Sequence, residues 1–160
     1  MIEFVSINEE NYKDVIDLEV AEGQKKFVAP NVRSLAECYL YRNNNDVFPY
    51  AIQDGEKVVG FLLLDTDEAE KEMMIWRMMI GKHYQGKGYG RETLKKVVQM
   101  SQEQDKYEVL IADYVKGNEV MGRLLRFEGF KDFSFNKKDN EYVLHYELKD
   151  SIDRPQVHEN

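Results

Sequence analysis

Three glycines at alternate positions, Gly86, Gly88 and Gly90, constrain the fold of this chain more than any other feature. They follow the apolar run 72–80 (EMMIWRMMI), whose composition is typical of a strand covered on both faces. They precede residues 91–103, where apolar positions recur at helical spacing. Glycine lets a backbone turn and approach a ligand closely, and the first amides of a helix are unpaired donors. The pattern therefore predicts a strand, an anion-binding loop and a helix.

Two familiar phosphate-binding loops fit this segment poorly. A Walker A loop ends in Gly-Lys-Ser/Thr, but here Gly86-Lys87 is followed by Gly88. A dinucleotide-binding fingerprint needs a small residue where this chain has Arg91, because helix and strand pack closely there. The chain also lacks the second βαβ half that this fold requires.

The periods of the other apolar positions predict eleven elements in the order β-α-α-β-β-β-α-β-α-β-β. We expect strands near residues 2–7, 48–53, 57–65, 72–80, 107–112, 131–135 and 141–148, and helices near 11–21, 34–42, 90–103 and 118–128. Ser34 and Glu37 have the spacing of a capping box, which predicts a helix start at Ser34. This order indicates an α+β (mixed α/β) fold, with residues 1–149 as a single domain and 150–160 as a polar C-terminal tail.

Composition excludes several classes of function. The 160 residues carry 30 acids against 22 Lys and Arg, a net charge of −8, whereas nucleic-acid binding needs clustered basic residues. No apolar run approaches the roughly 20 residues of a membrane helix, and the N-terminus does not resemble a secretory signal. Cys38 is the only cysteine and the three histidines are scattered, which predicts no disulfide, no metal site and a reducing, cytoplasmic compartment.

The sequence Gln85-x-x-Gly88-x-Gly90 after a buried strand resembles the acetyl-CoA signature of the GNAT superfamily of N-acetyltransferases. Asn118 followed by Gly129-Phe130 is similar to a second element of that family, and the element order matches over about residues 1–148. The resemblance implies an acetyltransferase domain with a central, mostly antiparallel sheet of about seven strands flanked by about four helices. It also implies acetyl-CoA as cosubstrate and is compatible with a homodimer.

The family places the donor along the central strand and the glycine loop. By this resemblance, strand backbone groups pair with the pantetheine arm and one amide stabilises the oxyanion, while loop amides hold the diphosphate. Gln85 would fix the loop, and Asn118 would hydrogen-bond the pantetheine. The residues assigned to the donor in this way are Met78, Met79, Ile80, Gln85, Gly86, Lys87, Gly88, Tyr89, Gly90, Arg91 and Asn118.

Residues 19–31 and 76–80 look like the corresponding segments of bacterial spermine/spermidine acetyltransferases, which implies a polyamine acceptor. Several carboxylates and an apolar wall would suit such a cationic chain. Glu19 and Glu22 lie three apart, on one face of the expected helix, Glu37 lies in the next helix, and Trp76 could cover the methylenes. Two alternatives stay open: another amine acceptor (an aminoglycoside, an amino acid or a protein amine), or a non-catalytic acyl-CoA-binding module.

The family usually has a tyrosine seven residues after the asparagine, as general acid toward the departing thiolate, but this chain has Leu125 there. Tyr114 is the substitute candidate; alternatively no acid is needed, since a thiol has a pKa of about 8.5. The attacking ammonium must also lose a proton, and Glu72, at the start of the central strand, is the candidate base. A solvated strand end for Glu72 and a packed aromatic for Tyr114 are the competing interpretations.

Overall fold

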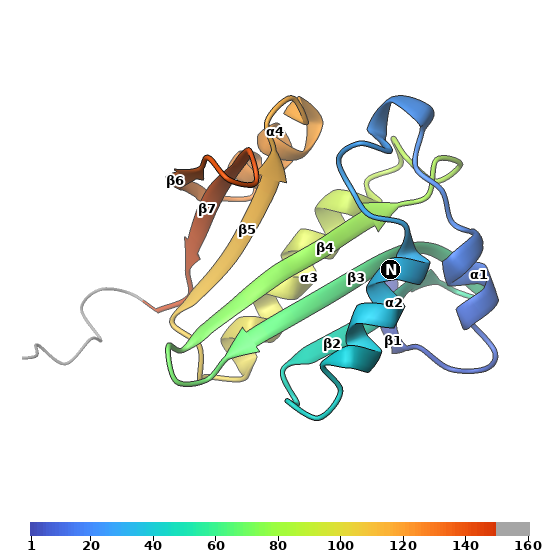
Figure 1. The fold of residues 1–160 in the computed structure, drawn as a ribbon, viewed down its shortest axis with the longest axis horizontal. Coiled ribbons are helices and arrows are strands. Elements are labelled where there is room, and N and C mark those ends of the chain that lie inside the picture. The colour runs from blue at the N-terminus through green and yellow to red at the C-terminus, as the bar shows by residue number, and fades with distance from the viewer. Residues whose placement is uncertain (150–160) are drawn as a thin grey trace, which may run out of the picture.

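The structure is a computed structural model that describes residues 1–149; the predicted tail, 150–160, lies outside the described residues. Seven strands form one sheet in the order β1-β2-β3-β4-β5-β7-β6 (Figure 1). The strands are β1 Ile2–Ser6, β2 Val47–Asp54, β3 Lys57–Asp67, β4 Glu72–Ile80, β5 Val109–Val115, β6 Lys131–Asn136 and β7 Glu141–Glu147. The helices are α1 Tyr12–Asp17, the 3-10 turn η1 Glu22–Gln24, α2 Asn31–Leu40, α3 Tyr89–Glu103 and α4 Glu119–Phe127.

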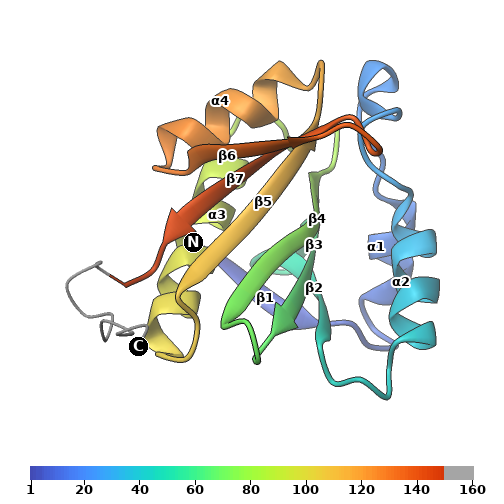
Figure 2. The same cartoon turned by 60° about the vertical axis from the view of Figure 1, so that its left-hand side comes forward.

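The sheet separates two helical layers. Helices α3 and α4 lie on one face and α1 and α2 on the other, as Figure 2 shows from the side. Leu94, Val97 and Leu125 belong to the larger core on the α3–α4 face, whereas Val15 belongs to the core on the opposite face. The predicted α+β fold, with a mostly antiparallel sheet of seven strands and four helices, is therefore confirmed for the described residues.

The β4–β5 pair is the single parallel pair of the described sheet, and it is short. The pairing runs from Glu72 opposite Val109 to Ile75 opposite Ala112, and the strands then diverge toward the glycine loop (Figure 1). A bulge lies at the same point, because Leu63 and Leu64 of β3 face Arg77 and Ile75, which leaves Trp76 without a partner. A bulge bends its strand and increases the local twist. The Trp76 bulge therefore turns β4 away from β5.

Two sequence predictions about helices are wrong. The first helix ends at Asp17 rather than near residue 21, because Leu18 takes an extended conformation (ψ 131°). The second helix begins at Asn31, directly after Pro30, so Ser34 is an interior position rather than an N-cap. Ser34 is completely buried and its hydroxyl accepts a hydrogen bond from Arg77, 3.1 Å away. Ser34 and Glu37 thus join α2 to the sheet through Arg77, instead of capping the helix.

Gly60 of β3 lets this strand approach β4 just before the glycine loop. A Cβ atom at Gly60 would lie 2.5 Å from the backbone oxygen of Met79, a contact that no side-chain rotation relieves. We expect Gly60→Ala to lower the free energy of unfolding by about 1–3 kcal/mol in urea titrations. Gly23→Ala is the control, since a Cβ there meets nothing within 4 Å. Equal unfolding midpoints for the two variants would contradict this reading of the β3–β4 contact.

Candidate active site

A cavity of about 830 Å³ lies where β4 and β5 separate. Its lining comes from the second half of β4, the end of β5, the start of α4, the glycine loop with the start of α3, and the segment 20–29. The predicted site residues that line it are Trp76, Met78, Met79, Ile80, Gln85, Gly86, Gly88, Tyr89, Gly90, Arg91, Tyr114 and Asn118. The donor residues predicted from the sequence are thus brought together, with Lys87 as the exception.

The glycine loop needs glycine for two different reasons. Gly86 and Gly88 have positive φ values of 75° and 89°, and a Cβ atom at either position would meet nothing within 4 Å. The backbone conformation therefore favours glycine at these two positions, and the space beside them is open. A Cβ atom at Gly90 would instead lie 3.2 Å from a methyl group of Leu124, so Gly90 allows α3 to pack closely on α4.

Gln85 ties the loop to two other elements. Its side-chain nitrogen donates to the carbonyl oxygen of Ile80 (2.9 Å) and to the side-chain oxygen of Gln24 (2.8 Å). Gln24 belongs to η1, so the link joins the end of β4 to the segment that covers the cavity. The neighbouring α3 begins after Gly88, and its first backbone amides have no acceptor within the helix. The loop therefore presents amide donors at the positive end of a 15-residue helix.

The side chains of Arg91 and Tyr89, at the start of α3, have partners outside the cavity. Arg91 forms an ion pair with Glu128 (2.7 Å) and lies over the ring of Phe127. The Tyr89 hydroxyl donates to the carboxylate of Asp54 (2.5 Å). The start of α3 therefore contributes mainly backbone groups, rather than charged side chains, to the cavity.

Helix α4 forms part of the opposite wall. Asn118 is its N-cap, and its side-chain oxygen accepts a long hydrogen bond (3.4 Å) from the amide of Met121. The hydroxyl of Tyr114 lies beside α4, where Gly122 leaves room for it and Arg126 donates a hydrogen bond to it (2.9 Å). Leu125, at the position of the family's usual tyrosine, is 1% exposed and belongs to the core.

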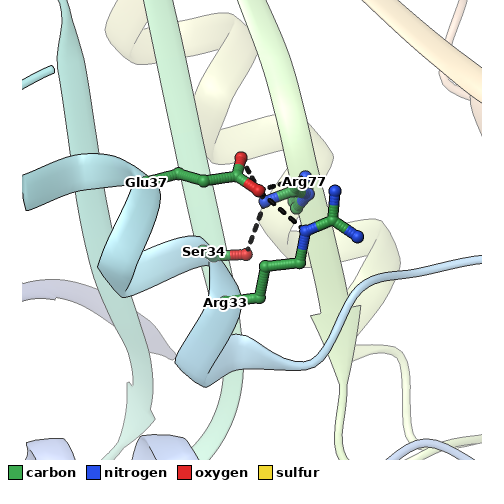
Figure 3. Close-up of polar contacts among 4 residues, drawn as sticks. All are labelled: Arg33, Ser34, Glu37 and Arg77. Carbon is green, nitrogen blue, oxygen red and sulfur yellow. Dashed lines mark hydrogen bonds and ion pairs between the residues drawn. The ribbon is translucent and has the colours of Figure 1, made fainter. Parts of the chain in front are cut away.

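Glu37 does not have a free carboxylate for a polyamine. Its oxygens accept hydrogen bonds from Arg77 (3.0 Å) and Arg33 (2.8 Å), in the cluster shown in Figure 3. Burial alone would raise the pKa of Glu37, but the bonds from both arginines lower it below the usual range. The carboxylate also lies outside the cavity lining, whereas Arg77 and Trp76 belong to it. The carboxylate that the sequence analysis assigned to the acceptor is thus engaged by two arginines, and a role of Glu37 in binding the acceptor stays a prediction.

Glu19 and Glu22 do not share a helical face, contrary to the sequence prediction. The first helix has already ended, so Glu19 lies in a loop and Glu22 begins η1. Glu19 pairs with Lys82 (3.2 Å) and Glu22 with Lys25 (2.8 Å). Neither carboxylate lines the cavity, although residues between and after them do.

Glu72 lies at the closed end of the β4–β5 pair, opposite Val109. It is not part of the cavity lining, and a strand rises about 3.3 Å per residue, so the cavity residues Met78 to Ile80 are distant. This position argues against Glu72 as the base. Glu72 thus lies on a strand that lines the cavity, but at the end where β5 still pairs with it.

Three acids to which the sequence analysis assigned no role in acetyl transfer line the cavity: Asp113, Asp139 and Glu141. Asp113 comes from β5, Glu141 from β7 and Asp139 from the turn between β6 and β7. Burial, followed by the charge of Glu141, raises the pKa of Asp113 to about 7. The signal that could have found them is the antiparallel pairing of β5 with β7, which places Val115 opposite Glu141 and Asp113 opposite Val143.

The sequence matches the profile of the Acetyltransferase (GNAT) family over residues 12–130. The chain belongs to this family. The match spans the strand, glycine loop and helix that build the cavity, and it supports an enzyme, an N-acetyltransferase, over a non-catalytic binding module. Within the described residues no helix is long and apolar enough to cross a membrane.

Individual relatives agree with this assignment. The chain is 27% identical over 139 residues to the probable spermine N(1)-acetyltransferase of Bacillus subtilis subsp. natto (strain BEST195), covering 81% of this chain and 88% of that protein. It is 26% identical, with the same coverage, to the spermine/spermidine N(1)-acetyltransferase of Bacillus subtilis (strain 168). Among solved structures, spermidine N-acetyltransferase from Vibrio cholerae in complex with CoA and spermine has a similar fold (TM-score 0.70, 12% identity, 90% of this chain and 92% of that chain).

The Glu37 cluster predicts how stability depends on pH. Because the folded protein holds the pKa of Glu37 below its ordinary value of 4.5, the ionised carboxylate stabilises the fold above that value. We expect Glu37→Gln to lower the free energy of unfolding by about 1–3 kcal/mol at pH 7. The difference from the wild type should vanish as the pH falls through the pKa of Glu37, which urea titrations at several pH values will measure.

Glu22→Gln is the control for this experiment, because the Glu22 carboxylate is 87% exposed in its ion pair. Exposed pairs contribute little to stability, so this variant should match the wild type at every pH. A Glu37→Gln difference that persists undiminished in acid would show that the Arg77 ion pair does not stabilise the fold.

Proposed function

We propose that this enzyme transfers the acetyl group of acetyl-CoA to a primary amine of spermidine or spermine by direct attack of the amine on the thioester. The observation that carries the proposal is the cavity between the diverging ends of β4 and β5, which has the glycine loop on one side and three carboxylates on the other. The relatives named for spermine and spermidine acetylation support the acceptor class.

The glycine loop fits the diphosphate of CoA. Open space beside Gly86 and Gly88 lets an anion reach the backbone, and the first amides of α3 would donate to it. Lys87 is exposed in the loop, and its charge would add to the attraction. Beyond Ile75, the β4 edge that faced β5 has no strand partner among residues 1–149. Backbone groups of Met78, Met79 and Ile80 are our candidates to pair with the pantetheine arm.

The thioester supplies the activated acetyl group, and the protein would supply orientation and charge stabilisation. A β4 amide directed at the thioester oxygen would stabilise the developing oxyanion, a contribution typically worth about 3–4 kcal/mol. Asn118 lines the cavity at the start of α4, where its side-chain nitrogen would reach the pantetheine. The oxygen of the same side chain caps the helix, so one residue would serve both purposes.

Tyr114 is our candidate for the acid that protonates the departing thiolate. Arginine can only donate, so the bond from Arg126 leaves the phenol proton of Tyr114 free to donate elsewhere. The Tyr114 ring also packs against Tyr142, with centroids 5.3 Å apart, and has a structural role as well. Tyr114→Phe therefore tests the acid role, because it removes the hydroxyl and keeps the ring.

The acids and the indole ring in the cavity lining suit a polyamine. Asp113, Asp139 and Glu141 would attract ammonium groups, and Trp76 offers an apolar surface to the methylenes between them. A homodimer and a cytoplasmic location stay predictions of the sequence analysis.

Thiol release from acetyl-CoA by the purified protein tests the proposal, with spermidine and spermine compared against an aminoglycoside, an amino acid and a lysine peptide. We expect saturable turnover with the polyamines. Turnover only with another amine would contradict the polyamine acceptor while retaining the N-acetyltransferase. No turnover with any amine would overturn the proposed reaction.

The loop is tested separately by Gly88→Ala. An L-residue at a φ of 89° is strained by about 1–2 kcal/mol, and relief of that strain would displace the amides. We expect the Kd for acetyl-CoA to rise by about tenfold or more in calorimetric titrations. Gly55→Ala is the matched control, because Gly55 has a similar φ of 61° in the β2–β3 turn, outside the cavity. An equal Kd for acetyl-CoA in both variants would show that the diphosphate does not bind to this loop.

A further inference from the structure

Asp113 occupies a distinctive place in the fold. It is the first residue of β5 after the last β4–β5 pair, Ile75 opposite Ala112, and so lies where the cavity opens. Residues alternate along the strand, and the flanking Ala112 and Tyr114 are buried in the core on the α3–α4 face. Asp113 therefore belongs to the opposite face of β5.

The Asp113 carboxylate has no cationic partner. Its Oδ1 atom is buried and accepts no hydrogen bond within residues 1–149, and no ion pair to Asp113 occurs in this part of the chain. The side-chain hydrogen bond that Asp113 does make is with another acid, Glu141. A buried carboxylate without a cationic partner is costly, and such groups are a feature of functional sites. A cationic ligand in the cavity would satisfy it.

The neighbouring elements place mainly acidic groups around Asp113. Glu141 of β7 and Asp139 of the β6–β7 turn act on it and are both acidic. His145 of β7 lies further along the same face, opposite Ile111, under the influence of Glu72 of β4 and Glu147 of β7. Arg126 of α4 bonds to Tyr114, which belongs to the core on the other face, and Lys116 is exposed after the strand.

The proposed reaction requires a proton acceptor in the cavity. An aliphatic ammonium has a pKa of roughly 10, so about one molecule in a thousand is neutral at pH 7. Glu72 lies outside the cavity, whereas Asp113 lines it beside the wall formed by the second half of β4. We propose, on the basis of the function proposed above, that Asp113 is the general base that takes the proton from the attacking amine.

The step balances without any further reactant. The N–H bond of the ammonium breaks and the proton passes to a carboxylate oxygen of Asp113, directly or through one water. The freed lone pair forms the C–N bond to the thioester carbonyl carbon, and the C–S bond breaks with its electrons on sulfur. As the amide forms, a second N–H bond of the former ammonium breaks, and this proton balances the one that the thiolate takes up to become the thiol, while Asp113 releases its own proton to solvent. A base whose pKa lies near the working pH is the most effective, and the pKa of Asp113 is about 7.

Asp113→Asn tests the proposal, with the amine that the wild type turns over. We expect kcat to fall by about a hundredfold or more, while the Kd for acetyl-CoA stays within twofold and the melting temperature does not fall. Asp46→Asn is the matched control. Asp46 also has a buried oxygen without a hydrogen-bond partner, but it lies outside the cavity, so its substitution should leave kcat unchanged.

Glu141→Gln supplies a readout that a merely structural role would not move. The charge of Glu141 raises the pKa of Asp113, so its removal lowers that pKa and keeps the base ionised in more acidic solution. We expect the acid limb of the kcat profile to shift to lower pH in this variant and to disappear in Asp113→Asn.

The outcomes separate this inference from the proposed function. An active wild type with an equally active Asp113→Asn variant, or an acid limb that Glu141→Gln does not move, would overturn Asp113 as the base and leave the acetyltransfer proposal intact. A wild type that turns over no amine would overturn the proposed function and this inference with it.

Discussion

The hydrogen bonding between β4 and β5 ends after four residue pairs, and the geometry of the site depends on this early end. A single extra residue, Trp76, turns β4 away at the point where pairing stops. The separation frees one edge of β4 and opens a cavity that is also lined by the glycine loop, the starts of α3 and α4, and the segment 20–29. Gln85 then anchors the glycine loop to the last residue of the same strand. A local irregularity of the backbone thereby creates space for a ligand inside a continuous sheet.

Charge is distributed unevenly around this space. Next to α2, the Arg77 guanidinium binds Glu37, so that neither side chain leaves an unpaired charge between helix and sheet. Across the cavity, Asp113 and Glu141 are acids without such a partner in the ion pairs found among residues 1–149. The wall of β5 and β7 therefore gives the cavity its negative character, and a cationic acceptor would meet that charge next to the free edge of β4.

Local patterns predicted most of the fold from the sequence. The apolar strand 72–80, the glycine loop and the helix near residues 118–128 depend on neighbouring residues, and the structure has all three. The acidic wall of the cavity was not predictable in this way, because Asp113 and Glu141 meet only through the pairing of β5 with β7. Glu19 and Glu22 were assigned to one helical face, but the helix ends early and the backbone oxygen of Glu19 binds the amide of Lys82 instead. Long-range contacts decided these positions.

A crystal structure of the chain with CoA is the most direct test of the central claim, that the divergence of β4 from β5 makes the donor site. We expect the diphosphate against the backbone amides of residues 86–91, and the pantetheine arm between β4 and the start of α4. The thiol would then lie beside the free edge of β4. CoA bound outside this cavity, or β4 and β5 paired beyond Ile75 in the complex, would contradict it.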